Sequence, residues 1–298
     1  MLGRLTALAM TALTASAGLA ETLEIDTYRG PANVSGQPGT IAVFDVAAAD
    51  TINALGVPIA GTVDGLYVEY LDDVARNAVD LGTFWEPDFE GVHALAPDLI
   101  VVGSRSSDQL DNMAKIAPSI DMTIDADLVG DAMARLRDYG RIFGKSDEAA
   151  ALEQAFQDRL EQAISAAQGR GDVLIVMTNG PKISAYGGGG RFGWLHKDVG
   201  LPEAAPEISA AIHGEAISFE FVRDTDPDWL IVVDRLAAIG QPGDNAKATL
   251  DNALVQQTKA WQTGQVIYLN AADIYVAGGG IQSMMRTLDR LIAGFAAS

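Results

Sequence analysis

Three arginines stand where the sequence pattern places loops at the ends of buried strands. Arg105 and Arg235 each follow an apolar run, and Arg191 follows a tract of four glycines. Arginine pairs with delocalised oxyanions in a forked geometry and also stacks on aromatic planes. In open α/β sheets, ligands bind beyond the carboxyl ends of the strands. The three residues therefore predict a site for an anionic ligand, with a structural ion pair as the alternative for any one of them.

Two further side chains offer metal-ligand chemistry near the same expected loops. His213 lies between elements, and Tyr275 lies between the last expected strand and the last expected helix, just before Gly278-Gly279-Gly280. Imidazole and phenolate oxygen suit Fe(III). A single His and a single Tyr in loops are more often surface or packing residues, and that alternative stays open. His93 and His196 fall inside expected helices and are interpreted as structural.

The glycine tract, residues 187–190, allows two interpretations. Glycines before a helix let backbone N–H groups approach an anion, and Arg191 follows directly. The tract is not a phosphate-binding loop of the Walker type, because no Lys-Ser or Lys-Thr pair follows it. An anion site and a tight turn are therefore both compatible with the sequence.

The stretch that ends at Arg105 recurs 130 residues later and ends at Arg235. Residues 89–105 and 219–235 share Phe, Glu, Val, Pro, Asp and Arg at one constant offset, without a gap. A repeat at this distance predicts two similar lobes, since solenoids repeat every 20–50 residues or so. Lobes that face each other would bring both arginines to one cleft.

The elements that must position these residues alternate between strands and helices, which predicts an α/β fold with largely parallel sheets. Ser146 can cap a helix over residues 146–168, whose apolar positions share one face. We expect this helix to join an N-terminal lobe, residues 21–145, to a C-terminal lobe, residues 169–298. Expected strands cover residues 40–45, 99–103, 172–177, 229–233 and 266–270, and expected helices cover 47–55, 89–95, 108–116, 131–143, 192–199, 219–223, 253–261 and 281–296.

The N-terminus has the pattern of a secretory signal peptide, residues 1–20. Arg4 is followed by an apolar stretch that ends in Gly18-Leu19-Ala20, which predicts cleavage after Ala20 and a periplasmic location. The apolar stretch is too short for a comfortable membrane anchor. The chain contains no cysteine, which excludes disulfides, thiolate metal sites and a lipid-modified cysteine at the cleavage point.

The composition and net charge of the chain indicate which classes of ligand it can bind. The chain has 298 residues, 48% of them hydrophobic, which suffices for two lobes, and its formal net charge is −20. Loss of one positive charge, Arg4, on cleavage would lower that value to −21. Nucleic-acid binding is not expected, because it depends on Lys and Arg side chains that neutralise phosphates. A local group of arginines can still hold an anion, since salt screens exposed charges beyond about 8–10 Å.

Taken together, these motifs resemble the periplasmic iron-siderophore-binding proteins of ABC importers, especially those for catecholate siderophores. The resemblance covers the whole mature chain. It is carried by residues 95–100, 116–118, 190–193, 213–214, 227–228, 233–235 and 250–252, and by Tyr275 before its glycines.

The resemblance implies a fold of two lobes joined by a helix and a function in capturing a ferric siderophore for an ABC permease. Arg105, Arg191 and Arg235 would hold the anionic ferric catecholate, and His213 and Tyr275 would fill iron sites that a tetradentate ligand leaves open. One acidic residue in each lobe, Glu90 and Glu220, would dock on the permease; solvated helix charges are the alternative for both. The family implies no intrinsic cofactor and no catalysis, and we expect a monomer.

Three positions depart from the family pattern. Asp108 stands where relatives often have a lysine, an all-glycine tract replaces a small-polar-Arg element, and Ile274 replaces an aromatic next to Tyr275. A binder of haem, cobalamin or a hydroxamate siderophore is the nearest alternative function, although a neutral ligand would not need three arginines. A periplasmic enzyme is the more distant alternative, and no GxSxG or HExxH motif supports it.

Overall fold

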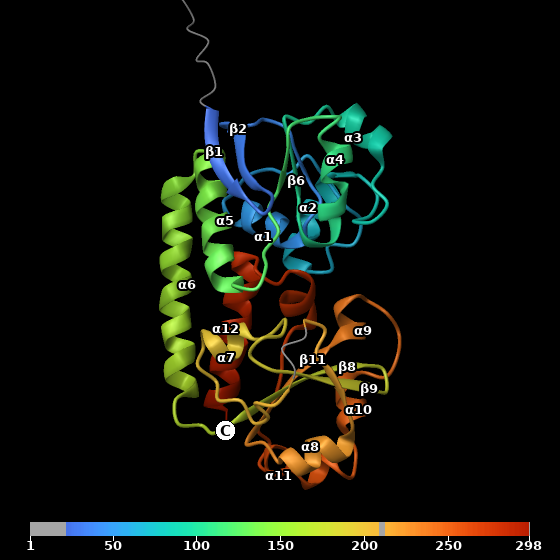
Figure 1. The fold of residues 1–298 in the computed structure, drawn as a ribbon, viewed down its shortest axis with the longest axis vertical. Coiled ribbons are helices and arrows are strands. Elements are labelled where there is room, and N and C mark those ends of the chain that lie inside the picture. Colours follow the sequence, from blue (N-terminus) through green and yellow to red (C-terminus); the bar gives the residue numbers. More distant parts are fainter. Residues whose placement is uncertain (1–21, 209–211, 298) are drawn as a thin grey trace, which may run out of the picture.

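The computed structural model describes residues 22–208 and 212–297, and within them the chain forms two α/β lobes. One long helix, α6 (Ser146–Ala167), runs along the side of both lobes (Figure 1). The expected α/β fold of two lobes and one long helix is confirmed. The predicted signal peptide, residues 1–20, lies outside the described residues.

The first lobe is built on a fully parallel sheet of five strands in the order β5-β4-β3-β6-β7. Its inner strand β6, next to the central β3, is an uninterrupted apolar run in which all four residues are buried, as expected for a parallel strand covered on both faces. The elements are β3 (Ile41–Val43), α1 (Val46–Ala54), β4 (Gly61–Thr62), η1 (Glu69–Leu71), α2 (Asp72–Asn77), β5 (Val79–Asp80), α3 (Phe89–Leu95), β6 (Leu99–Val102), η2 (Ser104–Gln109), α4 (Leu110–Met113), β7 (Ser119–Asp121) and α5 (Leu128–Ile142).

The second lobe has a mixed sheet in the order β10-β9-β8-β11-β12. The strands β8, β11 and β12 are parallel, whereas β9 and β10 are antiparallel additions at one edge. The elements are β8 (Val173–Asn179), β9 (Lys182–Tyr186), α7 (Trp194–Lys197), β10 (Glu215–Ile217), α8 (Phe219–Thr225), β11 (Trp229–Asp234), α9 (Arg235–Ala238), α10 (Ala246–Leu250), η3 (Val255–Gln257), α11 (Lys259–Gln262), β12 (Val266–Tyr268), η4 (Ala272–Val276) and α12 (Ile281–Ala296).

The sequence repeat is also a structural repeat. Helices α3 and α8 start and end at equivalent positions, and each is followed by a residue in the left-handed conformation, Ala96 and Asp226. The repeated aspartate ties together the starts of two neighbouring strands in each lobe. Asp98 accepts hydrogen bonds from the backbone N–H groups of residues 39 and 40, and Asp228 accepts one from the N–H of Asp172.

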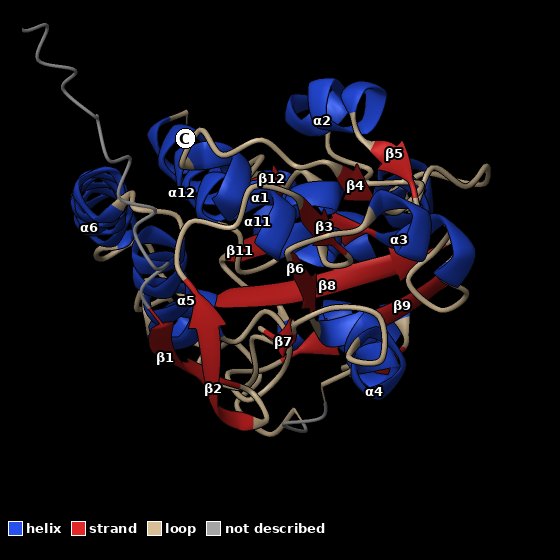
Figure 2. Cartoon of the chain, turned by 90° about the horizontal axis from the view of Figure 1, so that it is seen from above, coloured by secondary structure: helices blue, strands red, loops and turns tan. Residues whose placement is uncertain are grey.

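Some local elements differ from the sequence-based expectation. Residues 22–35, for which the sequence pattern indicates a strand and a turn-rich segment, form an antiparallel hairpin of β1 (Thr22–Thr27) and β2 (Gly30–Ser35) beside α5, as Figure 2 shows. The helices expected over residues 108–116 and 253–261 are each divided into a 3₁₀ turn and a short α-helix. Short polar stretches of this kind form helices only where tertiary contacts support them, and their periodicity is weak.

The two lobes meet at a buried carboxylate, Asp50 of α1. Its oxygens accept hydrogen bonds from the N–H groups of Gln282 and Ser283 at the start of α12, and from the Tyr70 hydroxyl. An acceptor at this place satisfies N–H groups that have no partner inside the helix. Burial raises the pKa of Asp50 to about 7, even though these hydrogen bonds favour its charged form.

We expect the Asp50→Asn variant to lose part of the pH dependence of stability. Because the pKa of Asp50 is raised from 3.8 to about 7 in the folded state, folded protein binds a proton more readily than unfolded chain between these values. This contribution to the free energy of unfolding is greatest below about pH 4 and is lost as the pH rises through 7. Three pKa units correspond to a contribution on the order of 4 kcal/mol.

Urea unfolding of the wild type and the variant between pH 5 and pH 8 measures the difference. Asp73→Asn is the matched control, because Asp73 is exposed on α2. Equal pH slopes for the wild type and Asp50→Asn would contradict the prediction.

Candidate functional site

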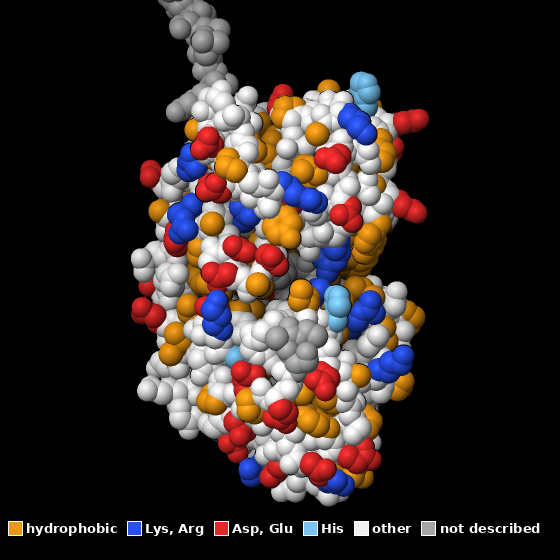
Figure 3. Space-filling view, viewed as in Figure 1, with side chains coloured by type: hydrophobic (Ala, Val, Ile, Leu, Met, Phe, Trp, Pro, Cys, Tyr) orange, Lys and Arg blue, Asp and Glu red, His pale blue; other side chains and the backbone are white. Residues whose placement is uncertain are grey.

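A cavity of about 330 Å³ lies between the two lobes. Figure 3 shows a hollow between the lobes with basic side chains on both sides of it. The first lobe lines the cavity from the loops that leave its sheet, and the second lobe lines it from the glycine tract and from η4. Its lining includes Asp45, Arg105, Thr123, Gly188, Arg191 and Tyr275.

Tyr275 is surrounded by all three of the predicted arginines. The guanidinium carbon lies 4.8 Å from the ring centroid for Arg191, and 5.9 Å for both Arg105 and Arg235. Arg235 also donates through Nε to the Tyr275 hydroxyl at 3.2 Å. A cation within about 6 Å of an aromatic face is attracted by the ring quadrupole. The fold thus brings together residues that are 40 to 170 positions apart in the chain.

The backbone around Tyr275 explains how it holds the arginines. Residues Ala272–Val276 form a π-helix, which the sequence pattern indicated only as a loop. The last carbonyl groups of a helix have no partner within it. Arg105 donates to the carbonyl oxygens of Tyr275 and Val276, at 3.1 and 3.3 Å, and Arg191 donates to that of Tyr275 at 3.5 Å. Two guanidinium groups therefore cap this helix, and one of them comes from the opposite lobe.

The glycines after Tyr275 allow the two lobes to approach closely. Gly279 has φ +94°, and a Cβ there would lie 2.6 Å from Ile124 Cδ1 of the first lobe. A Cβ on Gly280 would lie 2.4 Å from the carboxyl carbon of Asp50. Glycine is the residue type that permits both the conformation and the contact.

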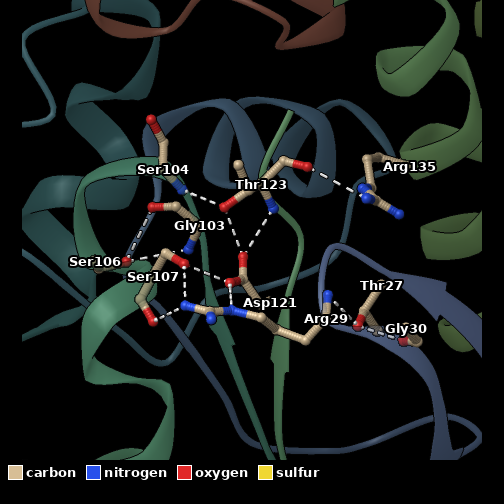
Figure 4. Close-up of polar contacts among 10 residues, drawn as sticks. All are labelled: Thr27, Arg29, Gly30, Gly103, Ser104, Ser106, Ser107, Asp121, Thr123 and Arg135. Carbon is tan, nitrogen blue, oxygen red and sulfur yellow. Dashed lines mark hydrogen bonds and ion pairs between the residues drawn. The ribbon is translucent and has the colours of Figure 1, made fainter. Parts of the chain in front are cut away.

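The loop that carries Arg105 is fixed by a network around Asp121 at the end of β7 (Figure 4). Asp121 accepts hydrogen bonds from the hydroxyl groups of Ser107 and Thr123, at 2.5 and 2.6 Å, and from Arg29 Nε at 3.1 Å. The Thr123 hydroxyl oxygen in turn accepts from the N–H of Ser104, which has φ +48°. This network holds the strained residue next to Arg105 in place.

The network also controls the charge of Asp121. Burial alone would raise its pKa, but the hydrogen bonds from Ser107, Thr123 and Arg29 outweigh burial and lower the pKa. The carboxylate is therefore a stable anion beneath the Arg105 loop. Asp121 and Arg29, which are 92 positions apart, are not among the residues predicted from the sequence. The sequence pattern predicts no strand over residues 119–121, where the structure has β7, so nothing in that pattern pointed to Asp121.

Arg105 is incompletely neutralised by the protein. Burial lowers its pKa and the neighbouring Arg191 charge acts in the same direction, whereas the Asp45 carboxylate acts against them. Burial also disfavours the charged form of Asp45 and so raises its pKa, although the N–H of Ala48 donates to this carboxylate. Both charged groups thus lie in an environment less favourable than water. Arg105 and Arg191 repel each other, and an anion in the cavity would offset this repulsion.

The structure places the other candidates as follows. The His213 side chain is exposed, and its neighbour Ile212 rather than His213 lines the cavity. Within the part of the chain that the structure describes, no group of three or more His, Cys, Asp or Glu side chains is placed to hold a metal ion. Glu90 and Glu220 are exposed in the first turns of α3 and α8, which Figure 1 shows in different lobes.

The glycine tract forms a tight turn, and one of its backbone N–H groups is already bonded to a carboxylate of the protein. Gly190 and Gly193 donate backbone hydrogen bonds to the carbonyls of Gly187 and Gly190. The N–H of Gly188 donates to the Glu203 carboxylate at 2.9 Å, so this N–H group already has an acceptor within the protein. His196, interpreted as structural, is buried, and its Nδ1 lies 2.9 Å from the carbonyl oxygen of Leu201.

Comparison with known proteins assigns the chain to a family. Residues 41–272 match the model of the periplasmic binding protein family, and the chain belongs to that family. Over residues 22–208 and 212–297, none of the helices is both long and apolar enough to cross a membrane.

Three similar proteins have names that state what they bind. The chain is 33% identical to the petrobactin-binding protein YclQ of Bacillus subtilis, over 86% of this chain and 82% of that one. It is 30% identical to the ferric-anguibactin-binding protein FatB of Vibrio anguillarum, over 91% and 87%. The crystal structure of the periplasmic catecholate-siderophore binding protein VctP of Vibrio cholerae superposes with a TM-score of 0.84 at 29% identity, covering 93% of this chain and all of that one.

We expect Asp121→Ala to destabilise the fold by about 2–4 kcal/mol, because donors on three residues, Arg29, Ser107 and Thr123, would lose their acceptor. Urea unfolding measures the loss. Asp73→Ala is the control, since it removes a carboxylate from an exposed ion pair with Arg76 and should leave the transition unchanged within error. Similar effects of the two substitutions would contradict the role given to Asp121.

Proposed function

We propose that this protein captures a ferric siderophore with catecholate donors and delivers it to an ABC permease in the inner membrane. One observation carries the proposal: three guanidinium groups converge on Tyr275 at a cavity between the lobes. The names of the relatives support the choice of ligand class, since they include petrobactin and anguibactin binders and a catecholate-siderophore binder. Its role is binding, without any bond made or broken.

The physical basis of capture is charge complementarity. A ferric catecholate carries net negative charge on phenolate oxygens, which guanidinium groups bind through charge-assisted hydrogen bonds. Each unit charge about 4 Å from a guanidinium gains roughly 4 kcal/mol at an effective dielectric of 20, before desolvation. Arg105 and Arg191 line the cavity, and Arg235 lies behind the Tyr275 hydroxyl. When the chelate binds, the arginines would therefore replace weak contacts with carbonyl groups and a phenol by contacts with an anion.

We propose His213 and Tyr275 as the residues that complete the coordination of iron when the siderophore supplies fewer than six donors. Tyr275 reaches the cavity directly. His213 would have to turn inward from its exposed position in the loop beside Ile212. Iron enters this site as part of the cargo.

Four further parts of the proposal concern the whole protein. We propose export with cleavage after Ala20, a free monomer in the periplasm, and permease docking through Glu90 and Glu220. The lobes, residues 21–145 and 169–298, would move little relative to each other, because a helix over residues 146–168 is a stiffer connection than extended strands.

Tryptophan quenching should show binding of ferric bis-catecholate and tris-catecholate below about 10 μM, a free energy near −7 kcal/mol. A neutral ferric hydroxamate should bind more weakly, because it lacks the charge that the arginines compensate. Arg105→Ala and Arg191→Ala should each weaken catecholate binding by about 10- to 100-fold, given 1.5–3 kcal/mol for a hydrogen bond to a charged group.

Arg76→Ala is the matched control for these arginine variants, since Arg76 is exposed on α2. The proposal fails if no ferric chelate binds below this concentration. It also fails if the hydroxamate binds as tightly as the catecholates.

Direct coordination by the His213 and Tyr275 pair has its own test. His213→Ala and Tyr275→Phe should weaken the bis-catecholate by at least tenfold and leave the hexadentate tris-catecholate within about twofold, because only the former leaves iron sites open. The ligand-to-metal charge-transfer band of the bis-catecholate complex should shift in both variants. Equal losses for the two chelates would mean that the pair only lines the pocket.

A further inference from the structure

Two exposed aromatic side chains, Tyr67 and Trp85, lie on loops next to the one that carries Arg105. We propose that they form an aromatic wall, Tyr67 together with Trp85, that stacks on the aryl rings of the iron chelate. The wall would extend the site beyond the cavity, past Arg105, and would select aryl chelates over citrate-type ones. This inference rests on the proposed function and names the residues that determine specificity within it.

The topology of the sheet places the wall. Strands β5, β4, β3 and β6 are parallel neighbours, so the loops at their carboxyl ends leave the same edge of the sheet. Tyr67 follows β4, Trp85 follows β5 and Arg105 follows β6. The two aromatic loops are tied to each other by the hydrogen bond from the N–H of Asp64 to the carbonyl of Gly82, at 2.8 Å.

Direct contacts connect Trp85 to the arginine. The ring of buried Phe84 lies 6.0 Å from the Arg105 guanidinium carbon and packs edge-on against Trp85, with centroids 5.7 Å apart. Gln109, in the 3₁₀ helix that carries Arg105, donates to the carbonyl of Trp85 at 3.4 Å. Phe84 thus forms the base of the wall, and the Trp85 indole projects from it.

Tyr67 is held in an unfavourable backbone conformation that places its ring. Its φ is +63°, which is uncommon for a bulky residue. The ring folds over Gly65, where a Cβ would lie 3.0 Å from the Tyr67 Cζ, so glycine makes room for it. The Tyr67 phenol raises the pKa of Arg105, against the larger lowering that burial causes. Strained residues of this kind cluster at ligand sites.

Exposure distinguishes the wall from packing. Trp85 is 64% exposed and Tyr67 is 46% exposed, although both are large aromatic side chains. An aromatic ring beside a guanidinium matches a catechol ring whose oxygens bind that guanidinium, since offset stacking and charge pairing can then occur together. Citrate and hydroxamate groups offer the oxygens without the ring.

The test compares an aromatic and an aliphatic side chain at one position. With ferric 2,3-dihydroxybenzoate as the probe, Trp85→Leu should weaken binding about 3- to 10-fold, whereas Trp85→Phe should stay within twofold of the wild type. Tyr67→Gly, which suits the positive φ, should also weaken binding about 3- to 10-fold. Tyr28→Leu, at an exposed tyrosine in the turn between β1 and β2, is the matched control and should bind like the wild type.

The outcomes separate the wall from the proposed function. Equal affinities of Trp85→Leu, Trp85→Phe and the wild type overturn the wall and leave the function intact. Equal losses for the Leu and Phe variants also overturn it, because stacking would not be the cause. If the wild type binds no ferric aryl chelate, both inferences fall. Ferric citrate, where the wild type binds it, should be held equally by all the wall variants.

Discussion

Repulsion between like charges is the constraint around which the space between the lobes is arranged. Three guanidinium groups surround the ring of Tyr275, in a chain whose formal net charge is −20. The π face of Tyr275 lies beside all three, and the carbonyl groups at the end of a π-helix accept hydrogen bonds from Arg105 and Arg191. The charge of the Asp45 carboxylate favours the charged form of Arg105. These partners are weaker than a bound anion would be. The arrangement therefore keeps the arginines in position while leaving most of their binding capacity for a ligand.

Two buried aspartates of the first lobe fix the geometry on which this arrangement depends. Asp121 holds the loop that carries Arg105, and Asp50 accepts the first N–H groups of α12, which follows Tyr275 and its glycines. Asp121 stays charged because its hydrogen bonds outweigh burial, whereas burial dominates for Asp50. The contact between the lobes therefore contains a carboxyl group whose pKa lies near neutral pH.

The duplication explains which features are shared by the lobes and which are not. The repeated aspartates, Asp98 and Asp228, join the starts of neighbouring strands, which is a requirement of the fold in both lobes. The repeated arginines leave equivalent strands but have different partners. Arg105 donates to backbone carbonyls of the opposite lobe, and Arg235 donates to the Tyr275 hydroxyl within its own lobe. Tyr275 lines the cavity from the second lobe, so the two sides of the cavity differ.

The sequence by itself determined the α/β class, the two lobes, the long helix and the presence of arginines at the ends of β6 and β11. The two lobes follow from the repeat of residues 89–105 at 219–235, and the fold class and the long helix follow from apolar patterns that are local in the sequence. Only the tertiary structure decided that Arg105, Arg191 and Arg235 meet at Tyr275, that a π-helix forms there, and that His213 stands outside the cavity. The places of Asp50, Asp121 and the aromatic wall were likewise decided there. Their contacts depend on how loops pack at a sheet edge and how closely the lobes approach, and spacing along the chain does not encode either.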